Sequence, residues 1–129
     1  MYKTQEAFWY AVRHAKPVTI GLNCSFGADQ LRPHVKLLSG IADTLLMAYP
    51  NAGLPNELGE YDELPDTTAS LVHQWADSGQ VNILGGCCGN TPQHIGAMAK
   101  AVEGLAPREV PKLKSEMRLA GLEPFTIAA

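Results

Sequence analysis

The sequence is poor in the features that mark membrane-spanning, secreted and nucleic-acid-binding proteins. None of its apolar runs approaches the ~18 residues of a membrane span. Its first six residues, MYKTQE, lack the charged-then-apolar plan of a secretory signal. The net charge is -3, so the sequence lacks the excess of Lys and Arg that is typical of nucleic-acid-binding proteins. We therefore expect a cytoplasmic protein with neither a membrane nor a nucleic acid among its partners.

Cysteine is also scarce, since the 129 residues contain only three. An odd number of cysteines in an apparently cytosolic chain does not fit a disulfide framework, so metal binding or thiol chemistry is the better interpretation. Hydrophobic residues make up 46% and charged residues 18%, which is the composition of an ordinary globular protein. The length predicts a single domain.

What the sequence does contain is an alternation of short apolar runs with amphipathic segments. The apolar spacing predicts an α/β fold with a parallel sheet, because strands alternate with helices, and such sheets place their sites at the carboxyl ends of the strands. Asp66 and Thr91 are expected to cap the last two helices, and Gly79 to end the first of these. The predicted helices are 5–15, 31–42, 66–79 and 92–102, and the predicted strands are 17–22, 44–48 and 81–84.

Two segments outside these elements are predicted to be irregular. The connection 49–65 exceeds the ~12–15 residues of most loops in compact domains, and long loops are often functional. Residues 107–118 predict a linker, and 119–127 predict an extended apolar tail. The acidic residues of the long connection fit no calcium-binding loop, so we expect them to be solvated: Glu57, Glu60, Asp62 and Glu63.

The three cysteines follow two of the predicted strands. Cys24 comes after the first strand and Cys87-Cys88 after the third, so a parallel sheet would bring them to one rim. The glycines around the pair supply the backbone freedom that turns both side chains inward. Three thiolate ligands would leave the fourth coordination position of Zn²⁺ open, as in catalytic zinc sites. Two alternatives stay open, namely three buried inert cysteines and a redox-active vicinal pair.

Three motifs resemble the homocysteine S-methyltransferase family. They are GLNC at 21–24, YPNAGLP at 49–55 and GGCCGNTP at 85–92, and together they span most of the chain. Within the family they look most like the homocysteine-binding zinc domain of cobalamin-dependent methionine synthases. The tail RLAGLEP at 118–124 resembles the segment that leads into the folate-binding domain, which favours the cobalamin enzymes over betaine- or S-methylmethionine-dependent relatives.

The resemblance implies an incomplete (β/α)8 TIM barrel, made of about its last three β/α units. Residues 1–106 would be the partial homocysteine-binding barrel and 107–129 a linker toward a folate-binding domain. It also implies zinc held by Cys24, Cys87 and Cys88, homocysteine as substrate, and methylcobalamin bound by another domain. The expected partners are the first half of the barrel and the folate- and cobalamin-binding domains. We expect the isolated chain to be inactive, or a module that docks on the rest of the barrel.

Four further residues are expected to contribute to the zinc or substrate site, although their sequence pattern alone supports these roles only weakly. By resemblance, Asn51 is a fourth zinc ligand that homocysteine displaces, although Pro-Asn-Ala-Gly is also ordinary turn chemistry. Gly86, Asn90 and Thr91 would receive the substrate carboxylate at the start of the last helix. His94, one turn later, is expected to be a surface residue or a neighbour of the site rather than a ligand.

Overall fold

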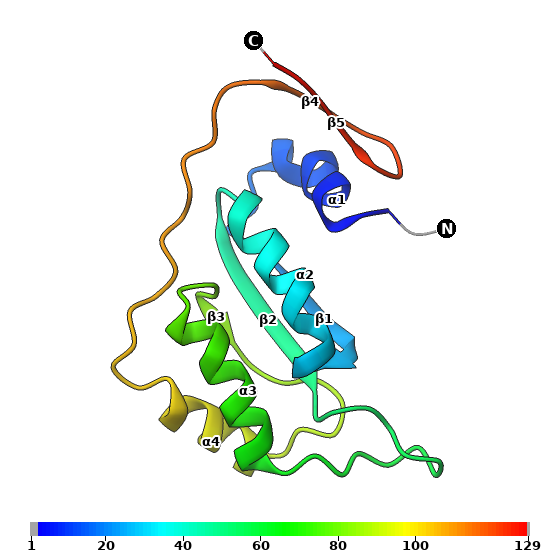
Figure 1. Ribbon diagram of the computed structural model, residues 1–129, viewed down its shortest axis with the longest axis vertical. Helices are drawn as coiled ribbons and strands as arrows, with labels where there is room; N and C mark the ends of the chain where they lie inside the picture. The colour runs from blue at the N-terminus through cyan, green and yellow to red at the C-terminus, as the bar shows by residue number, and fades with distance from the viewer. Residues whose placement is uncertain (1–2, 129) are drawn as a thin grey trace.

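The computed structural model describes residues 3–128 and shows a mixed α/β fold (Figure 1). Helices α2 and α3 lie along a small sheet. Helix α1 and a C-terminal hairpin lie at one end, and α4 lies beside α3 at the other. The elements are α1 Gln5–Val12, the 3-10 turn η1 Arg13–Ala15, β1 Thr19–Gly27, α2 Ala28–Ile41, β2 Leu45–Asn51, α3 Pro65–Asp77, β3 Ile83–Leu84, α4 Pro92–Ala101, β4 Met117–Ala120 and β5 Pro124–Ile127.

The main sheet has the strand order β1-β2-β3, and both neighbouring pairs are parallel. Each of the three strands is followed by a helix, so the α/β class and the parallel sheet predicted from the sequence are confirmed. Parallel strands joined by helices place all their carboxyl ends at one edge. In this chain that edge is where the three cysteines lie.

The core lies between the sheet and the helices that cover one of its faces. Ile20 and Leu46 are paired across β1 and β2 and are buried beneath Leu38 of α2 and Trp75 of α3. Alternate residues of a strand point to opposite faces. On the opposite face Met47 is only partly buried, so this face is the less covered of the two. Of the described helices, none is long and apolar enough to cross a membrane.

Several predicted boundaries are corrected by the structure. Strand β1 runs on to Gly27, so Cys24 lies within its irregular last part. Helix α2 begins at Ala28 and contains Pro33, where a later start was expected. Helix α3 is preceded by Leu64 as its N-cap, because Pro65 fits the first helical position, where the missing N–H is not needed. Asp66 therefore lies in the first turn instead of at the cap.

Other details of the prediction are confirmed. Gly79 has a left-handed φ of 65° just after α3, and Thr91 caps α4 ahead of Pro92. The apolar tail is extended as expected, and it forms an antiparallel hairpin, β4–β5, with β4 beginning at Met117. This hairpin packs on α1, where Thr4 N donates to Leu122 O at 2.9 Å and the Arg118 guanidinium lies over the Tyr10 ring.

The amino-terminal ends of the strands are closed by a buried arginine. Arg108 follows α4 in the segment predicted as a linker, and it is 4% exposed. Its guanidinium donates to the backbone oxygens of Ser39, Ala42 and Thr44. The Asn82 side chain donates to Arg108 O at 2.8 Å. The chain after α4 is thereby fixed across the end of the sheet opposite to the cysteines.

Candidate metal centre

The structure brings the three cysteine sulfurs into one cluster at the carboxyl ends of β1 and β3. The Cys24 and Cys88 Sγ atoms are 3.6 Å apart and those of Cys87 and Cys88 are 3.9 Å apart. All three sulfurs lie within 4.8 Å of one another. Among the described residues this is the one group of at least three His, Cys, Asp or Glu side chains placed to hold a metal ion. The shared rim expected from the sequence is therefore observed.

An irregularity in β1 turns Cys24 toward the other sulfurs. Asn23 pairs with Tyr49 and Gly27 pairs with Asn51, so β1 has two more residues than β2 between these pairs. Cys24 and Ser25 take up the extra length with left-handed φ values of 63° and 64°. This conformation costs about 1–2 kcal/mol for a residue other than glycine. Such strain is typical of functional sites, where the surrounding structure holds it in place.

The loop that carries Cys87 and Cys88 is fixed to the end of β2 by hydrogen bonds. Cys87 N donates to Pro50 O at 2.9 Å, and Ala52 N donates to Cys88 O at 2.9 Å. The Asn90 side chain also donates to Pro50 O, at 2.9 Å. These bonds let neighbouring cysteines point into the same site, because the chain here is an irregular loop and not a continued strand.

The spacing of the sulfurs fits a tetrahedral zinc ion. Zinc–thiolate bonds of ~2.3 Å place any two sulfurs of a tetrahedron about 3.8 Å apart. Two of the separations, 3.6 and 3.9 Å, lie on either side of that value, and all three sulfurs lie within 4.8 Å of one another. Three thiolates form the soft donor set that zinc accepts, and they leave the fourth position for another ligand.

The three thiols do not ionise equally. The Ser25 backbone N–H hydrogen-bonds to the Cys24 sulfur and lowers the pKa of this thiol, with a further contribution from Cys88. The pKa of Cys88 is raised, chiefly because its thiol hydrogen-bonds to Cys24 and then to Cys87. Cys24 therefore ionises before Cys88, whose proton is held to higher pH. A metal ion that binds all three thiolates has to displace that proton.

Asn51 lies in the site, as expected, at the end of β2. It is 3% exposed, and its Oδ1 accepts a hydrogen bond from Cys88 N at 3.1 Å. Its side chain also hydrogen-bonds to the Cys24 sulfur and contributes to the lowered pKa of that thiol. Asn51 thus links Cys24 on β1 to Cys88 on the loop after β3. Its role as a fourth ligand stays a prediction.

The residues predicted to bind substrate lie on either side of Cys87 and Cys88 in the sequence. Gly86 is in close contact with Asn90, since a Cβ at Gly86 would lie 2.3 Å from the Asn90 Cγ. The backbone amide of Asn90 donates to Cys87 O, and that of Thr91 donates to His94 Nδ1. The amides expected to receive a carboxylate are therefore engaged within the chain, whereas the Asn90 Oδ1 is buried without a partner among the described residues.

His94 is buried and holds two segments together. It is 6% exposed, so it is not on the surface. Its Nδ1 completes a capping box with Thr91, and its Nε2 lies 2.7 Å from Glu63 O. His94 thereby joins the start of α4 to the end of the loop that precedes α3, and it is not among the clustered metal donors.

Tyr61 is a residue of this site that the sequence motifs do not predict. It lies in the long loop between β2 and α3, and its side chain contacts the loop that carries Cys88. Burial raises the pKa of the Tyr61 hydroxyl, and the charge of the Cys88 thiolate and a hydrogen bond to it raise that pKa further. The only signal in the sequence was the length of the loop.

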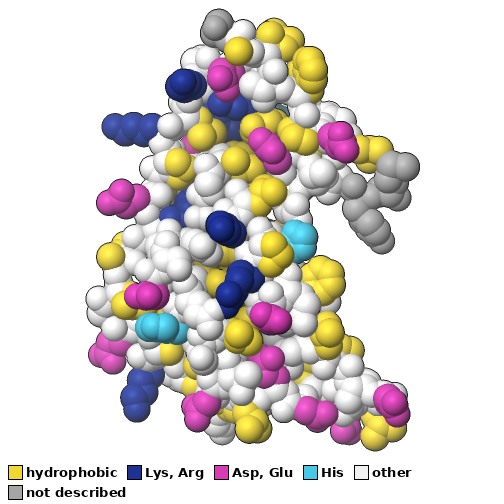
Figure 2. All heavy atoms as spheres, viewed as in Figure 1, with side chains coloured by type: hydrophobic (Ala, Val, Ile, Leu, Met, Phe, Trp, Pro, Cys, Tyr) yellow, Lys and Arg dark blue, Asp and Glu magenta, His cyan; other side chains and the backbone are white. Residues whose placement is uncertain are grey.

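Three of the four acidic residues of the same loop lie in solvent. Figure 2 shows acidic and apolar side chains at the projecting tip of this loop, at the lower right. Glu57, Glu60 and Asp62 are exposed, in agreement with the solvated loop predicted from the sequence, whereas Glu63 is half-buried and its carboxylate accepts from Thr68 Oγ1. Asn56 organises the tip by accepting from Leu58 N and Glu60 N, both at 2.9 Å.

A comparison with known families decides the affiliation of the chain. The family model described as homocysteine S-methyltransferase matches residues 3–102. The chain belongs to the homocysteine S-methyltransferase family. The match covers all three parallel strands and all three cysteines, and it ends just after α4. The cluster is thus part of a methyltransferase domain whose family acts on homocysteine.

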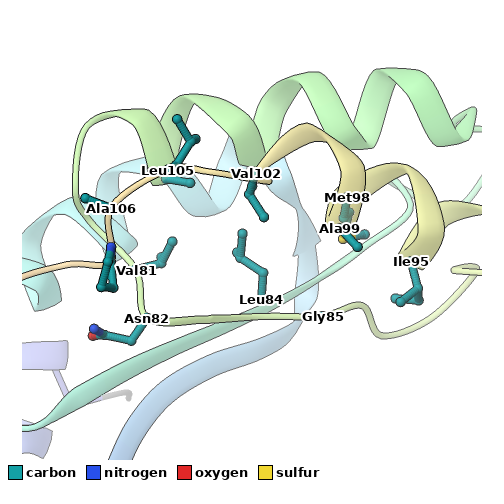
Figure 3. Close-up of a pocket in the computed structure, with 12 residues that line it drawn as sticks. Val81, Asn82, Leu84, Gly85, Ile95, Met98, Ala99, Val102, Leu105 and Ala106 are labelled. Carbon is teal, nitrogen blue, oxygen red and sulfur yellow. The ribbon is translucent and has the colours of Figure 1, made fainter.

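An apolar cavity lies apart from the sulfurs, between β3 and α4. It has a volume of roughly 240 Å³. Figure 3 shows Leu84 of β3 directed toward Val102, with Val81, Met98 and Leu105 around the same space. Its lining contains no cysteine, histidine or carboxylate, so it brings no metal or acid–base chemistry to the site.

Proposed function

We propose that this chain is the zinc-binding part of a homocysteine methyltransferase. Cys24, Cys87 and Cys88 bind one Zn²⁺, and the thiolate of homocysteine occupies the fourth position. The observation that carries the proposal is the cluster of three sulfurs at the strand ends of a chain that belongs to this family. A redox role of the Cys87-Cys88 pair has less support, because a two-cysteine redox centre does not explain why Cys24 lies beside the pair.

The donor set suits methyl transfer to sulfur. Zinc, when bound, supplies the positive charge that lets a thiol with an ordinary pKa near 8.5 ionise at neutral pH. The three cysteine thiolates bring three negative charges, so the substrate sulfur keeps the electron density it needs to attack a methyl group. Asn51 holds Cys24 and Cys88 in place and is close enough to act as the displaceable fourth ligand.

Asn90 is proposed to orient the other end of the substrate. Its Oδ1 is buried, and it accepts no hydrogen bond from the described residues. A buried acceptor without a partner costs about 1–3 kcal/mol, which a donor on the ligand would recover. The ammonium group of an amino acid is such a donor. The proposal assigns Gly86 and Asn90 to the substrate; the two are in contact with each other, and Thr91 caps the start of α4 beside them.

The architecture proposed for the complete domain is a (β/α)8 barrel to which this chain contributes about three β/α units. Two features support the proposal. The sheet is parallel with sequential strand order, as in such barrels, and the sulfurs lie at the carboxyl ends of the strands, where barrel enzymes have their sites. The apolar cavity along β3 and α4 would then face the neighbouring unit.

Methylcobalamin is proposed as the methyl donor, bound by another domain. The support is the resemblance of the tail 118–124 to the segment that precedes a folate-binding domain. The hairpin formed by this tail packs on α1, so it is an ordered part of the described structure. A donor other than methylcobalamin would leave the zinc site unchanged.

X-ray absorption at the zinc edge tests the proposed function. The zinc-loaded chain should show three sulfur neighbours at about 2.3 Å and one lighter neighbour. Homocysteine should raise the count to four sulfurs. Homoserine, which carries a hydroxyl in place of the thiol, is the matched control and should leave three. A spectrum that homocysteine does not change, or one with fewer than three sulfurs before it is added, would refute the proposal.

A further inference from the structure

We propose that Tyr61 is a positioning residue of the zinc site, whose hydroxyl donates a hydrogen bond to the Cys88 sulfur while its ring covers the loop that carries Cys88. The proposal rests on the proposed function, because it assigns Tyr61 a role toward the zinc-bound thiolate. The observation behind it is the contact of the Tyr61 side chain with Gly89, the residue after Cys88, made by a loop that is distant in sequence from Cys24 and from the Cys87-Cys88 pair.

The contact between Tyr61 and Gly89 fixes the ring next to the cluster. Gly89 directly follows Cys88 and has a left-handed φ of 79°. A Cβ at Gly89 would lie 2.3 Å from the Tyr61 Cβ and 2.5 Å from its Cγ. Only glycine therefore meets both demands of this position, the backbone conformation and the space. The base of the Tyr61 ring lies where any other side chain at 89 would begin.

The loop around Tyr61 is anchored on both sides. Tyr61 forms an isolated antiparallel bridge with Pro55, which closes the loop upon itself. Two residues later, Glu63 O is held by the buried His94, and the Glu63 carboxylate accepts from Thr68 Oγ1 at 2.5 Å. These bonds limit the freedom of Tyr61, so little ordering is needed to keep its hydroxyl near the sulfur.

A hydrogen bond to a metal-bound thiolate changes the electron density on sulfur. Cys88 is the most exposed of the three cysteines, and it directly precedes Gly89, which the Tyr61 side chain contacts. A phenol donor stabilises the Cys88 thiolate against protonation, so the metal competes with a less tightly bound proton for the sulfur. Partners of this kind around metal ligands are worth 10–100-fold in metal affinity.

The test uses the whole chain with Zn²⁺ and with Co²⁺ as a coloured substitute. Tyr61→Phe keeps the ring on Gly89 and removes only the hydroxyl. We expect its zinc affinity, measured by chelator competition, to fall about 10–100-fold. We also expect its thiolate-to-cobalt charge-transfer band to move to longer wavelength, since a thiolate without this donor gives up an electron more easily. Loss of packing alone would not shift that band in the metal-bound protein.

Two variants complete the design. Tyr10→Phe removes a hydroxyl that donates to Glu6 on α1, so it should leave both readouts unchanged. Tyr61→Leu removes the ring as well and should weaken zinc further. A Tyr61→Phe chain with the affinity and band position of the unmodified chain would overturn the role of Tyr61 alone. If the unmodified chain bound neither metal, the proposed function itself would fail.

Discussion

The two ends of the parallel sheet differ in how their backbone and polar side chains are stabilised. At the amino-terminal ends of the strands, the side chains of Arg108 and Asn82 are held by hydrogen bonds: the Arg108 guanidinium donates to several backbone oxygens, and Asn82 accepts from Leu46 N while it donates to Arg108 O. At the carboxyl ends, two residues of β1 have left-handed φ, and three thiols face each other. The buried Asn90 Oδ1 there has no partner among the described residues.

This difference indicates which end holds the fold together and which performs the chemistry. A network with all its hydrogen bonds made is rigid and costly to disrupt, whereas groups left strained or unpaired are available to a ligand. Substitutions at the Arg108 end should therefore lower stability and leave the metal site intact in the folded molecules. Substitutions at the cysteine end should change metal binding with a smaller effect on stability.

The largest effect on stability is expected from Arg108→Met. The substitution leaves the backbone oxygens of Ser39 and Ala42 without the Arg108 donors, each at a cost of about 1–3 kcal/mol, so we expect a total loss of about 2–6 kcal/mol. Urea denaturation measures it. Arg32→Met, at an exposed position of α2, should stay within about 0.5 kcal/mol. Zinc content of the folded Arg108→Met protein should equal that of the unmodified chain, and a loss of zinc would contradict the comparison.

The next effect is expected from Gly89→Ala at the cysteine end. Gly59 has nearly the same φ, 78° against 79°, but nothing lies within 4 Å of a Cβ placed there. Gly59→Ala should therefore cost only the backbone strain of about 1–2 kcal/mol. Gly89→Ala has the same strain and also displaces Tyr61, so it should be the more destabilising and should weaken zinc. Equal effects of the two substitutions would mean that the Tyr61 contact is unimportant.

A smaller effect on zinc is expected from Asn51→Ala. A neutral amide oxygen is a weak ligand beside thiolate, so most zinc should be retained. The zinc-edge absorption spectrum without substrate should change, because Asn51 holds Cys88 N and is the proposed fourth ligand. Asn82→Ala is the matched amide at the opposite end of the sheet, and it should lower stability without altering the spectrum. An unchanged spectrum for Asn51→Ala would remove this residue from the site.

The smallest effect concerns the ion pair between Arg13 and Asp43. The two hydrogen bonds from Arg13 lower the pKa of the Asp43 carboxyl in the folded protein. A carboxyl with a lowered pKa stabilises the fold above its unfolded pKa of ~3.9, and this contribution is lost as the pH falls through the folded value. Asp43→Asn should flatten the dependence of the urea midpoint on pH below about 4. An Asp43→Asn protein with the same acid dependence as the unmodified chain would exclude this pair as its source.

The fold class and the meeting of the cysteines could be predicted from the sequence because both follow from local patterns. Apolar periodicity gave the order of strands and helices, and the parallel arrangement then placed Cys24 and Cys87 at one edge. The boundaries were less accurate where a local rule competes with a longer-range contact. The extra residues of β1 around Cys24 are an example, since the register is set by pairing with β2.

The partners that come from distant segments could not be predicted. Proline and charged residues around Arg108 predict a linker. Only the fold shows that the Arg108 guanidinium donates to backbone oxygens near the end of α2 and before β2. Tyr61 was hidden in a loop with no periodicity. His94 was expected at the surface or beside the site, although its two ring nitrogens join α4 to that loop. Each of these roles depends on three-dimensional packing.

The central claim is that the three cysteines act as one zinc site, and the zinc content of the Cys24→Ser protein tests it most directly. Elemental analysis after dialysis should give one zinc per unmodified chain. Cys24→Ser should lose most of it, with an affinity reduced by more than the 10–100-fold typical of residues around the ligands, because three protein ligands leave no redundancy. Circular dichroism should show that the variant is still folded, since Cys24 lies outside the apolar core. A folded Cys24→Ser protein that retains one zinc per chain would contradict the account.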